Sequence, residues 1–141
     1  MSRWSPQPCP DEPDGLILFD GACVFCSRWV RLVIRLDRKR RFRFTPIQSD
    51  RGRALAVRFG IDPDCPETNA VVWNRRIFFK SDAALTVLSA LPVTASLGLL
   101  RGLPRRLRDA VYDRIARNRY RIFGRTSQCM VPSAADRARF L

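Results

Sequence analysis

The chain has no histidine, and this absence removes several kinds of chemistry at once. Catalysis by Ser-His-Asp or Cys-His groups needs an imidazole as general base. Zinc and iron sites with histidine ligands are excluded for the same reason. Any reaction must therefore depend on cysteine, carboxylate, lysine, arginine or tyrosine side chains, or on a bound cofactor.

Lysine is also scarce, because only Lys39 and Lys80 occur among 26 basic residues, which stand against 13 acidic ones. The net charge of +13 favours nucleic acid, an anionic membrane or acidic partners. An arginine excess of this kind also follows from the codon composition of a genome. We therefore prefer the interpretation that the positive charge forms a solvated basic surface. A basic module that binds nucleic acid or an anionic membrane stays an alternative, with nucleic acid the less favoured because no motif of exposed stacking aromatics is evident.

The sequence lacks a clear membrane-spanning segment. The uncharged residues 83–100 come closest, but they fall short of the ~20 apolar residues of a span and are interrupted by Pro92 and Gly98. We expect two short buried helices here, and peripheral membrane contact stays open. The first ten residues contain no apolar signal-peptide core, which predicts a cytoplasmic location.

The apolar pattern predicts one α/β domain over residues 15–132, followed by a tail at 133–141. Residues 1–14 contain four of the ten prolines and three acids, so we expect a flexible leader without a fold of its own. Cys9 would then lie outside the domain.

Strands and helices are expected to alternate within the domain. Strands are predicted at 16–19, 41–46, 70–73 and 77–79, and helices at 23–37, 49–59, 81–92, 93–101 and 104–124. Ser49 and Ser81-Asp82 are the expected N-caps, and Gly124 ends the last, amphipathic helix. This order is that of a thioredoxin-like domain: a central mixed sheet of about four strands, flanking helices and a helical C-terminal extension.

The strongest functional motif is Cys23-Val24-Phe25-Cys26, which lies where the first strand turns into the first helix. Residues three apart on a helix share a face, so the two sulfurs can meet. The first helical turn offers unpaired N–H groups and the positive end of the helix dipole, which stabilise a thiolate. We expect Cys23 to be an acidic, exposed nucleophile and Cys26 a shielded resolving thiol.

This cysteine pair indicates a thiol-disulfide oxidoreductase of the protein-disulfide reductase type. Its partners would be a disulfide-containing protein or small molecule and an electron donor that the sequence does not identify. Asp20, at the end of the first strand, has two interpretations. Its carboxylate either relays a proton to or from Cys26, or forms an Asx turn with Gly21 that caps the helix, and both can hold together.

A structural zinc site is the alternative for the cysteines. Cys23, Cys26, Cys65 and Cys129 could supply four ligands, but Cys65 and Cys129 stand alone in the sequence, without a second C-x-x-C. We therefore favour redox chemistry and expect neither a metal nor a cofactor. Cys65 is interpreted as a bystander, and Cys129 as either an extra redox thiol or a packing residue.

The motif region resembles a known family. Residues 18–26, with the sequence LFDGACVFC, resemble the defining motif of the DCC family of thiol-disulfide oxidoreductase-like proteins. The resemblance continues through residues 41–49, 81–84 and 112–125, and spans about 15–132. It implies a thioredoxin-like fold with the motif cysteines as the redox pair.

One departure from true thioredoxins concerns the residue before the third strand. Thioredoxins place a cis-proline there beside the active cysteines, whereas this chain has Thr68-Asn69, with Pro66 the nearest substitute. This departure argues against efficient reduction of general protein disulfides. Arg117 and Arg119 are candidates for binding an anionic substrate, although a solvated helix surface is the favoured interpretation. Tyr112 and Tyr120 are expected to be packing residues.

Overall fold

Five short strands form one open sheet in the order β1-β5-β4-β2-β3. The computed structural model describes residues 4–124 and 134–141. The parallel pair of β2 and β3 and the antiparallel neighbours make the sheet mixed, as predicted, with one short strand more than expected. The strands are β1 (Gln7–Pro8), β2 (Leu16–Phe19), β3 (Arg43–Pro46), β4 (Ala70–Trp73) and β5 (Arg76–Phe79).

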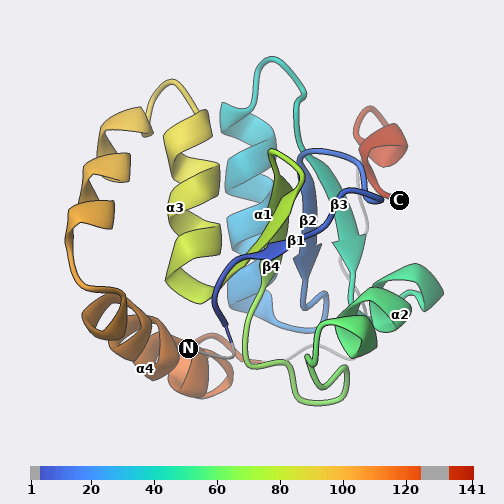
Figure 1. Cartoon of the computed structure of the whole chain (residues 1–141). Helices are drawn as coiled ribbons and strands as arrows, with labels where there is room; N and C mark the ends of the chain where they lie inside the picture. Colours follow the sequence, from blue (N-terminus) through green and yellow to red (C-terminus); the bar gives the residue numbers. More distant parts are fainter. Residues whose placement is uncertain (1–3, 125–133) are drawn as a thin grey trace.

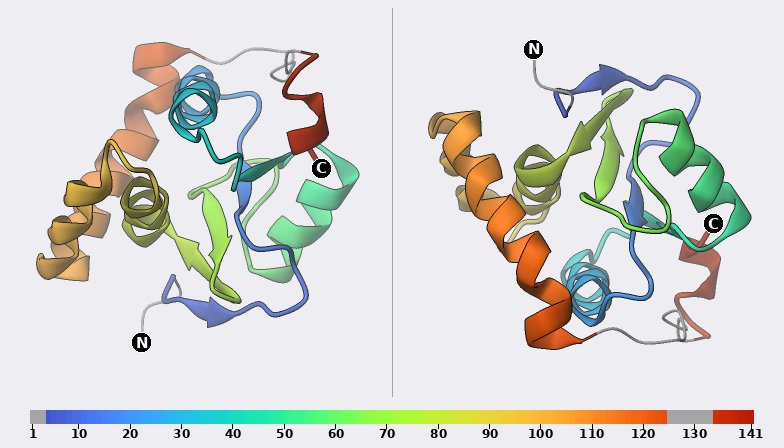
Figure 2. Two further views of the ribbon diagram at one scale, coloured as in Figure 1. Left: turned by 90° about the horizontal axis from the view of Figure 1, so that it is seen from above. Right: turned by 90° about the horizontal axis from the view of Figure 1, so that it is seen from below.

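Helices cover both faces of the sheet, which confirms the thioredoxin-like α/β class (Figures 1 and 2). On one face lie α1 and α3, and on the other lies α2, while α4 crosses the outer ends of α1 and α3. The helices are α1 (Val24–Leu36), α2 (Asp50–Arg58), α3 (Lys80–Ala90) and α4 (Arg105–Phe123), with 3₁₀ helices η1 (Ala95–Gly102) and η2 (Arg137–Arg139).

The position of β2 inside the sheet explains why its four residues are all apolar and do not alternate with polar ones. Its residues point alternately to the two faces, and all four are buried. Leu16 and Leu18 pack in the cluster beneath α2, whereas Ile17 and Phe19 pack in the cluster beneath α1 and α3. A strand covered on both faces requires apolar residues throughout. The C-terminal end of this strand leads directly into the motif cysteines.

The expected flexible leader is wrong for residues 4–14. Gln7 pairs with Ile77 across the sheet edge, and Trp4 and Cys9 belong to the hydrophobic core. Pro8 is tolerated in β1 because an edge strand leaves some of its N–H groups unpaired in any case. Cys9 therefore lies inside the domain, where burial raises the pKa of its thiol and makes it a poor nucleophile.

The C-terminal tail packs against the domain as well. Phe140 forms a bridge with Phe44 of β3, so residues 134–141 cover the edge of the sheet. Arg139 is buried and lies 2.5 Å from a carboxylate oxygen of Asp37, just beyond the end of α1. The last residues of the chain thus tie β3 to the C-terminal end of α1.

The segment after α3 differs most from the prediction. Pro92 follows the end of α3 as expected, but residues 95–102 form the 3₁₀ helix η1 with no buried residue. The expectation of two buried helices is therefore wrong for the second one, because η1 packs on α3 from one side only (Figure 1). Within the described residues, no helix is long and apolar enough to cross a membrane.

Candidate dithiol site

Cys23 is the N-cap residue of α1, as the sequence predicts, and Cys26 lies one turn further into the helix. The Cys26 N–H donates a hydrogen bond to the Cys23 sulfur over 3.4 Å. The helix N-terminus therefore presents one of its unpaired N–H groups to a cysteine sulfur and not to a hydroxyl or carboxylate. Both cysteines are free thiols in the structure.

The two thiols differ in acidity. A hydrogen bond from the Cys26 thiol lowers the pKa of Cys23 to about 6, assisted by the Cys26 N–H and the positive charge of Arg119, while burial opposes the shift. The same hydrogen bond, burial and the negative charge of Cys23 raise the pKa of Cys26. At neutral pH Cys23 is therefore largely a thiolate and Cys26 a thiol. These states fit a nucleophile and a resolving thiol, respectively.

The exposed nucleophile expected from the sequence is wrong, because Cys23 is 0 % exposed. The end of α4 passes over the start of α1, and the Val24 N–H lies 3.5 Å from the carbonyl oxygen of Gly124 (Figure 2). In a domain without this C-terminal helix, the N-terminus of α1 would face solvent. A sequence pattern for the first βα unit contains no sign of a helix about 100 residues later.

Asp20 forms the Asx turn that the sequence allows. Its Oδ1 accepts a hydrogen bond from the Ala22 N–H over 3.0 Å and a second from the Gln48 amide over 2.7 Å. Gln48 also accepts from the Gly21 N–H, so it holds the turn from the adjacent end of β3. The other carboxylate oxygen, Oδ2, lies 3.4 Å from the guanidinium of Arg119. Its role as a proton relay stays a prediction.

Arg119 reaches into the site from α4. The interpretation as a solvated surface residue is wrong here, because Arg119 is only 4 % exposed. Its guanidinium donates to the carbonyl oxygen of Pro66 over 2.6 Å and to the sulfur of Cys26 over 3.6 Å. Arg117 is exposed and donates to the Asp113 carbonyl of its own helix, so the structure does not bring it to the cysteines.

Asn69 occupies the position directly before β4 where thioredoxins have a cis-proline. The described residues contain no cis peptide bond. The side-chain amide of Asn69 lies 3.8 Å from the Cys26 sulfur, and its backbone N–H donates to the Tyr112 hydroxyl over 3.1 Å. The Pro66 carbonyl accepts a hydrogen bond from Arg119, and it is Asn69 that contacts Cys26. The sequence identifies this position by its place before the strand, but it does not predict a role for Asn69.

An ionic cluster holds α4 against the start of α3. Asp82 pairs with Arg105 over 2.9 Å and with Arg108 over 2.8 Å, and Lys80 pairs with Asp113 over 2.6 Å. The expectation that Ser81-Asp82 caps α3 is wrong, because the N-cap is Phe79 and has no side-chain cap. These side chains bind α4 instead. The cluster thereby positions the helix that carries Tyr112 and Arg119 to the cysteines.

A pocket of about 200 Å³ lies beside Cys26, between α1, α3 and α4. Cys26, Asn69 and Arg119 contribute polar groups to its wall, and Cys23 does not line it. Its other walls are mostly apolar and include Phe25, Trp29, Ala83, Val87, Leu88 and Ile115. A mostly apolar pocket with a few converging polar groups is typical of a small-molecule or side-chain binding site.

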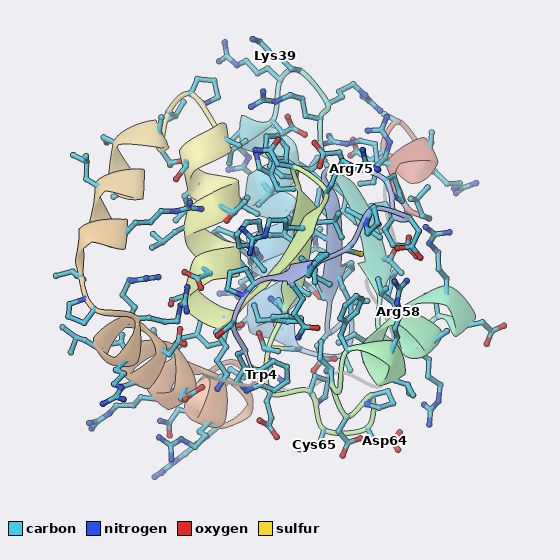
Figure 3. All side chains as sticks on the ribbon, in the orientation of Figure 1. Trp4, Lys39, Arg58, Asp64, Cys65 and Arg75 are labelled. Carbon is cyan, nitrogen blue, oxygen red and sulfur yellow. The ribbon has the colours of Figure 1, made fainter. Side chains whose placement is uncertain are left out.

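The remaining cysteines do not join the pair. Cys65 is exposed in the loop before β4, where Figure 3 places it beside Asp64 at the edge of the molecule. Cys129 lies outside the described residues, as does the side chain of Tyr120. Within the described part of the chain, no three potential metal ligands form a group.

The strand β2, the C-x-x-C motif after it and the helix α1 that the motif begins are the features of a thioredoxin-like protein with a cysteine pair at the start of its first long helix. Comparison with known proteins gives the family. The chain belongs to the DCC1-like thiol-disulfide oxidoreductase family, whose sequence model matches residues 17–125.

Two relatives extend the similarity along the chain. The uncharacterized protein YuxK of Bacillus subtilis is 35 % identical over 130 residues, which cover 92 % of this chain and 95 % of the relative. A DCC family protein of Arabidopsis thaliana, described as chloroplastic, is 37 % identical over 116 residues, covering 81 % of this chain and 67 % of the relative. No solved structure matches the chain.

Proposed function

We propose that the chain exchanges disulfides through a Cys23–Cys26 cycle in which Cys23 attacks and Cys26 resolves. The observation that carries this proposal is the hydrogen bonding of Cys26 to the Cys23 sulfur at the N-terminus of α1. It makes one sulfur a thiolate near neutral pH and keeps the other protonated. An attacking thiol is most effective when its pKa lies near the ambient pH.

The first half of the cycle is attack on a substrate disulfide. The Cys23 thiolate forms a bond to one substrate sulfur, the substrate S–S bond breaks, and the second substrate sulfur leaves as a thiolate that takes a proton. Cys23 then carries a mixed disulfide. Because Cys23 is buried, a substrate reaches it only when groups over the start of α1 move aside.

The second half of the cycle uses Cys26. Once Cys23 is bonded to substrate, the hydrogen bond to Cys23 and its negative charge no longer raise the pKa of Cys26. Arg119, 3.6 Å from the Cys26 sulfur, then stabilises the Cys26 thiolate, and Asp20 accepts the proton. Cys26 bonds to Cys23 and releases the substrate as a second thiol, so the pair is oxidised and the substrate is reduced by two electrons.

The substrate is a protein or small-molecule disulfide that carries an apolar group. The pocket beside Cys26 has room for such a group, and its walls are largely apolar. Asn69 takes the position of the substrate-orienting cis-proline of thioredoxins, so its amide orients the substrate. A thiol reductant returns the pair to the dithiol form, which suits a reducing compartment such as the cytoplasm.

Reduction of a small apolar disulfide by dithiothreitol, with and without the protein, tests the proposal. Wild type and the matched control Cys65→Ser, which removes the exposed free thiol, should both accelerate the reaction. The Cys23→Ser variant should have no activity above the uncatalysed rate. Full activity in Cys23→Ser, or loss of activity in Cys65→Ser alone, would show that another thiol carries the reaction.

A further inference from the structure

Exposed apolar side chains concentrate in one segment of the molecule. Of the twelve large hydrophobic residues exposed in the described chain, nine lie between residues 93 and 122. Leu99 is the most exposed of them, at 84 %. We call these nine the apolar stripe: Val93, Leu97, Leu99, Leu100, Leu103, Leu107, Val111, Ile115 and Ile122. Scattered single exposures are normal, whereas a concentration of this kind marks an interaction surface.

The stripe runs along η1 and α4, beginning in the turn before η1 and ending at the C-terminal end of α4. Figures 1 and 2 show η1 on the outer side of α3, whereas α4 crosses the end of α3 and continues past the end of α1. The adjoining side of α4 is already occupied, because it carries Arg119 and Tyr112 into the redox site. Ile115 contributes to both regions, because it lines the pocket beside Cys26 and is still about half exposed. Leu107, Val111 and Ile122 each have more than half of their surface exposed to solvent.

Exposed arginines accompany the stripe on α4. Arg114 lies three residues after Val111 and seven after Leu107, and Arg121 follows another seven residues on. Residues at these spacings are neighbours on a helix surface, so the cations border the aliphatic side chains. Arg105, Arg106 and Arg117 are exposed on the same helix.

We propose that the apolar stripe and its bordering arginines dock on the surface of an anionic lipid bilayer. Aliphatic side chains enter the boundary between headgroups and acyl chains, while the arginines bind lipid phosphates. No described helix is suited to cross the membrane, so α4 would lie in the plane of the interface. This inference is independent of the redox proposal.

A second copy of the chain fits this face poorly. Two copies joined symmetrically through the stripe would place the arginines of one against those of the other. The acidic residues of α4 do not offset this charge, because Asp109 accepts from Ser81 and Asp113 pairs with Lys80. The charge of +13 over the whole chain opposes self-association further.

Nucleic acid would bind the arginines of this surface but not its aliphatic side chains. Phosphates would pair with the arginines, but proteins that bind single strands add aromatic side chains on which the bases stack. The stripe is entirely aliphatic, so bases or a duplex backbone would leave it in water. An anionic bilayer provides both a negative surface and an apolar interior.

The experiment is sedimentation of the reduced full-length protein with vesicles of phosphatidylglycerol and phosphatidylcholine, compared with phosphatidylcholine alone, at low and high salt. One test variant combines Arg114→Glu with Arg121→Glu, and another combines Leu99→Ser with Ile122→Ser. Their matched controls lie elsewhere: Arg75→Glu with Arg76→Glu at the β4–β5 turn (Arg75 is labelled in Figure 3), and Leu32→Ser with Val57→Ser. Circular dichroism and urea unfolding verify that each variant is folded.

We expect wild type to bind the anionic vesicles and not the neutral ones, with binding weakened by salt. Each test pair should lower the vesicle partition coefficient about tenfold or more, and each control pair should lower it much less. Absence of vesicle binding would overturn the proposal. So would an equal loss in control and test pairs, a dimer that the Leu99→Ser/Ile122→Ser variant abolishes, or binding to duplex DNA that exceeds binding to vesicles.

Discussion

The guanidinium of Arg119 lies 3.6 Å from the sulfur of Cys26, although 93 residues separate them in the sequence. The same guanidinium contacts Asp20 and the carbonyl oxygen of Pro66. One buried cation thus connects the end of β2, the start of α1 and the loop before β4. Its charge lowers the pKa values of both motif thiols, against the burial that raises them.

Removing the positive charge of Arg119 should make the Cys23 thiolate less stable relative to the thiol. We expect Arg119→Met to raise the pKa of Cys23 and to slow disulfide reduction near neutral pH, and Arg119→Lys to restore part of both. The matched control is Arg117→Met, because Arg117 is exposed on the same helix and far from the pair. Thiolate absorbance in the ultraviolet measured across pH gives the pKa. An equal pKa in Arg119→Met and wild type would mean that the cation serves packing alone.

The hydrogen bond from Cys26 is the largest cause of the low Cys23 pKa. Cys26→Ala removes the side-chain donor, whereas Cys26→Ser keeps a hydroxyl in its place. We therefore expect the pKa of Cys23 to rise clearly in Cys26→Ala and less in Cys26→Ser, as measured by the pH dependence of alkylation by iodoacetamide. Identical pKa values in the two variants would exclude the hydrogen bond as the cause.

The low pKa of Cys23 also makes stability depend on pH. An unfolded cysteine has a pKa of about 8.5, so between about pH 6 and 8.5 the unfolded chain binds a proton that the folded chain does not. The free energy of unfolding of the reduced protein should rise across this window by up to about 3 kcal/mol relative to Cys23→Ser. The contribution is lost as the pH falls through 6.

Above about pH 8.5 the trend should reverse, because the raised pKa of Cys26 keeps a proton in the folded state that the unfolded state has lost. Urea unfolding at several pH values, under a reductant and for wild type and Cys23→Ser together, measures the difference. A difference that stays constant between pH 6 and 8.5 would contradict the assignment of a depressed pKa to Cys23.

The ionic cluster at Asp82 should matter for both stability and chemistry. Asp82 and Arg108 have side chains only 10 % exposed, so Asp82→Ala leaves a nearly buried cation without its main partner. We expect a loss of roughly 3 kcal/mol in stability. The pKa of Cys23 should rise too, since a loosened α4 no longer holds Arg119 in place.

The matched control is Asp64→Ala, whose side chain is 78 % exposed and pairs with Arg53 over 3.4 Å. This exposed pair should contribute less than about 1 kcal/mol. Denaturant unfolding compares the two variants, and thiolate absorbance reports the site. If Asp82→Ala unfolds like Asp64→Ala, the cluster does not hold α4.

The first half of the site could be predicted from the sequence because it is local. The apolar run of β2, the Asp20-Gly21 turn and the spacing of Cys23 and Cys26 lie within one βα unit, and short-range rules describe that unit well. The two strands of the β4–β5 hairpin could be predicted for the same reason. However, β5 begins at Arg76, one residue earlier than predicted, so the turn has only two residues, Asn74 and Arg75, which both adopt the left-handed conformation.

The remaining half depends on contacts distant in sequence. Arg119 and Arg117 are two residues apart in an arginine-rich helix, and only the docking of α4 decides which of them is buried. The sequence around Asn69 does not distinguish it from other loop residues, and only the position of β4 in the sheet places it beside Cys26. Packing of residues 4–14 and 134–141 against the sheet cannot be predicted from the sequence, because proline-rich and charged segments carry little periodicity.

Mass spectrometry of a trapped mixed disulfide tests the central claim most directly. The reduced Cys26→Ser protein, treated with a small apolar disulfide, should accumulate one adduct, and peptide mapping should place it on Cys23. The Cys23→Ser protein treated in parallel should carry little or no adduct on Cys26, because the Cys26 thiol is buried. An adduct on Cys26, Cys65 or Cys129 in place of Cys23 would contradict the account.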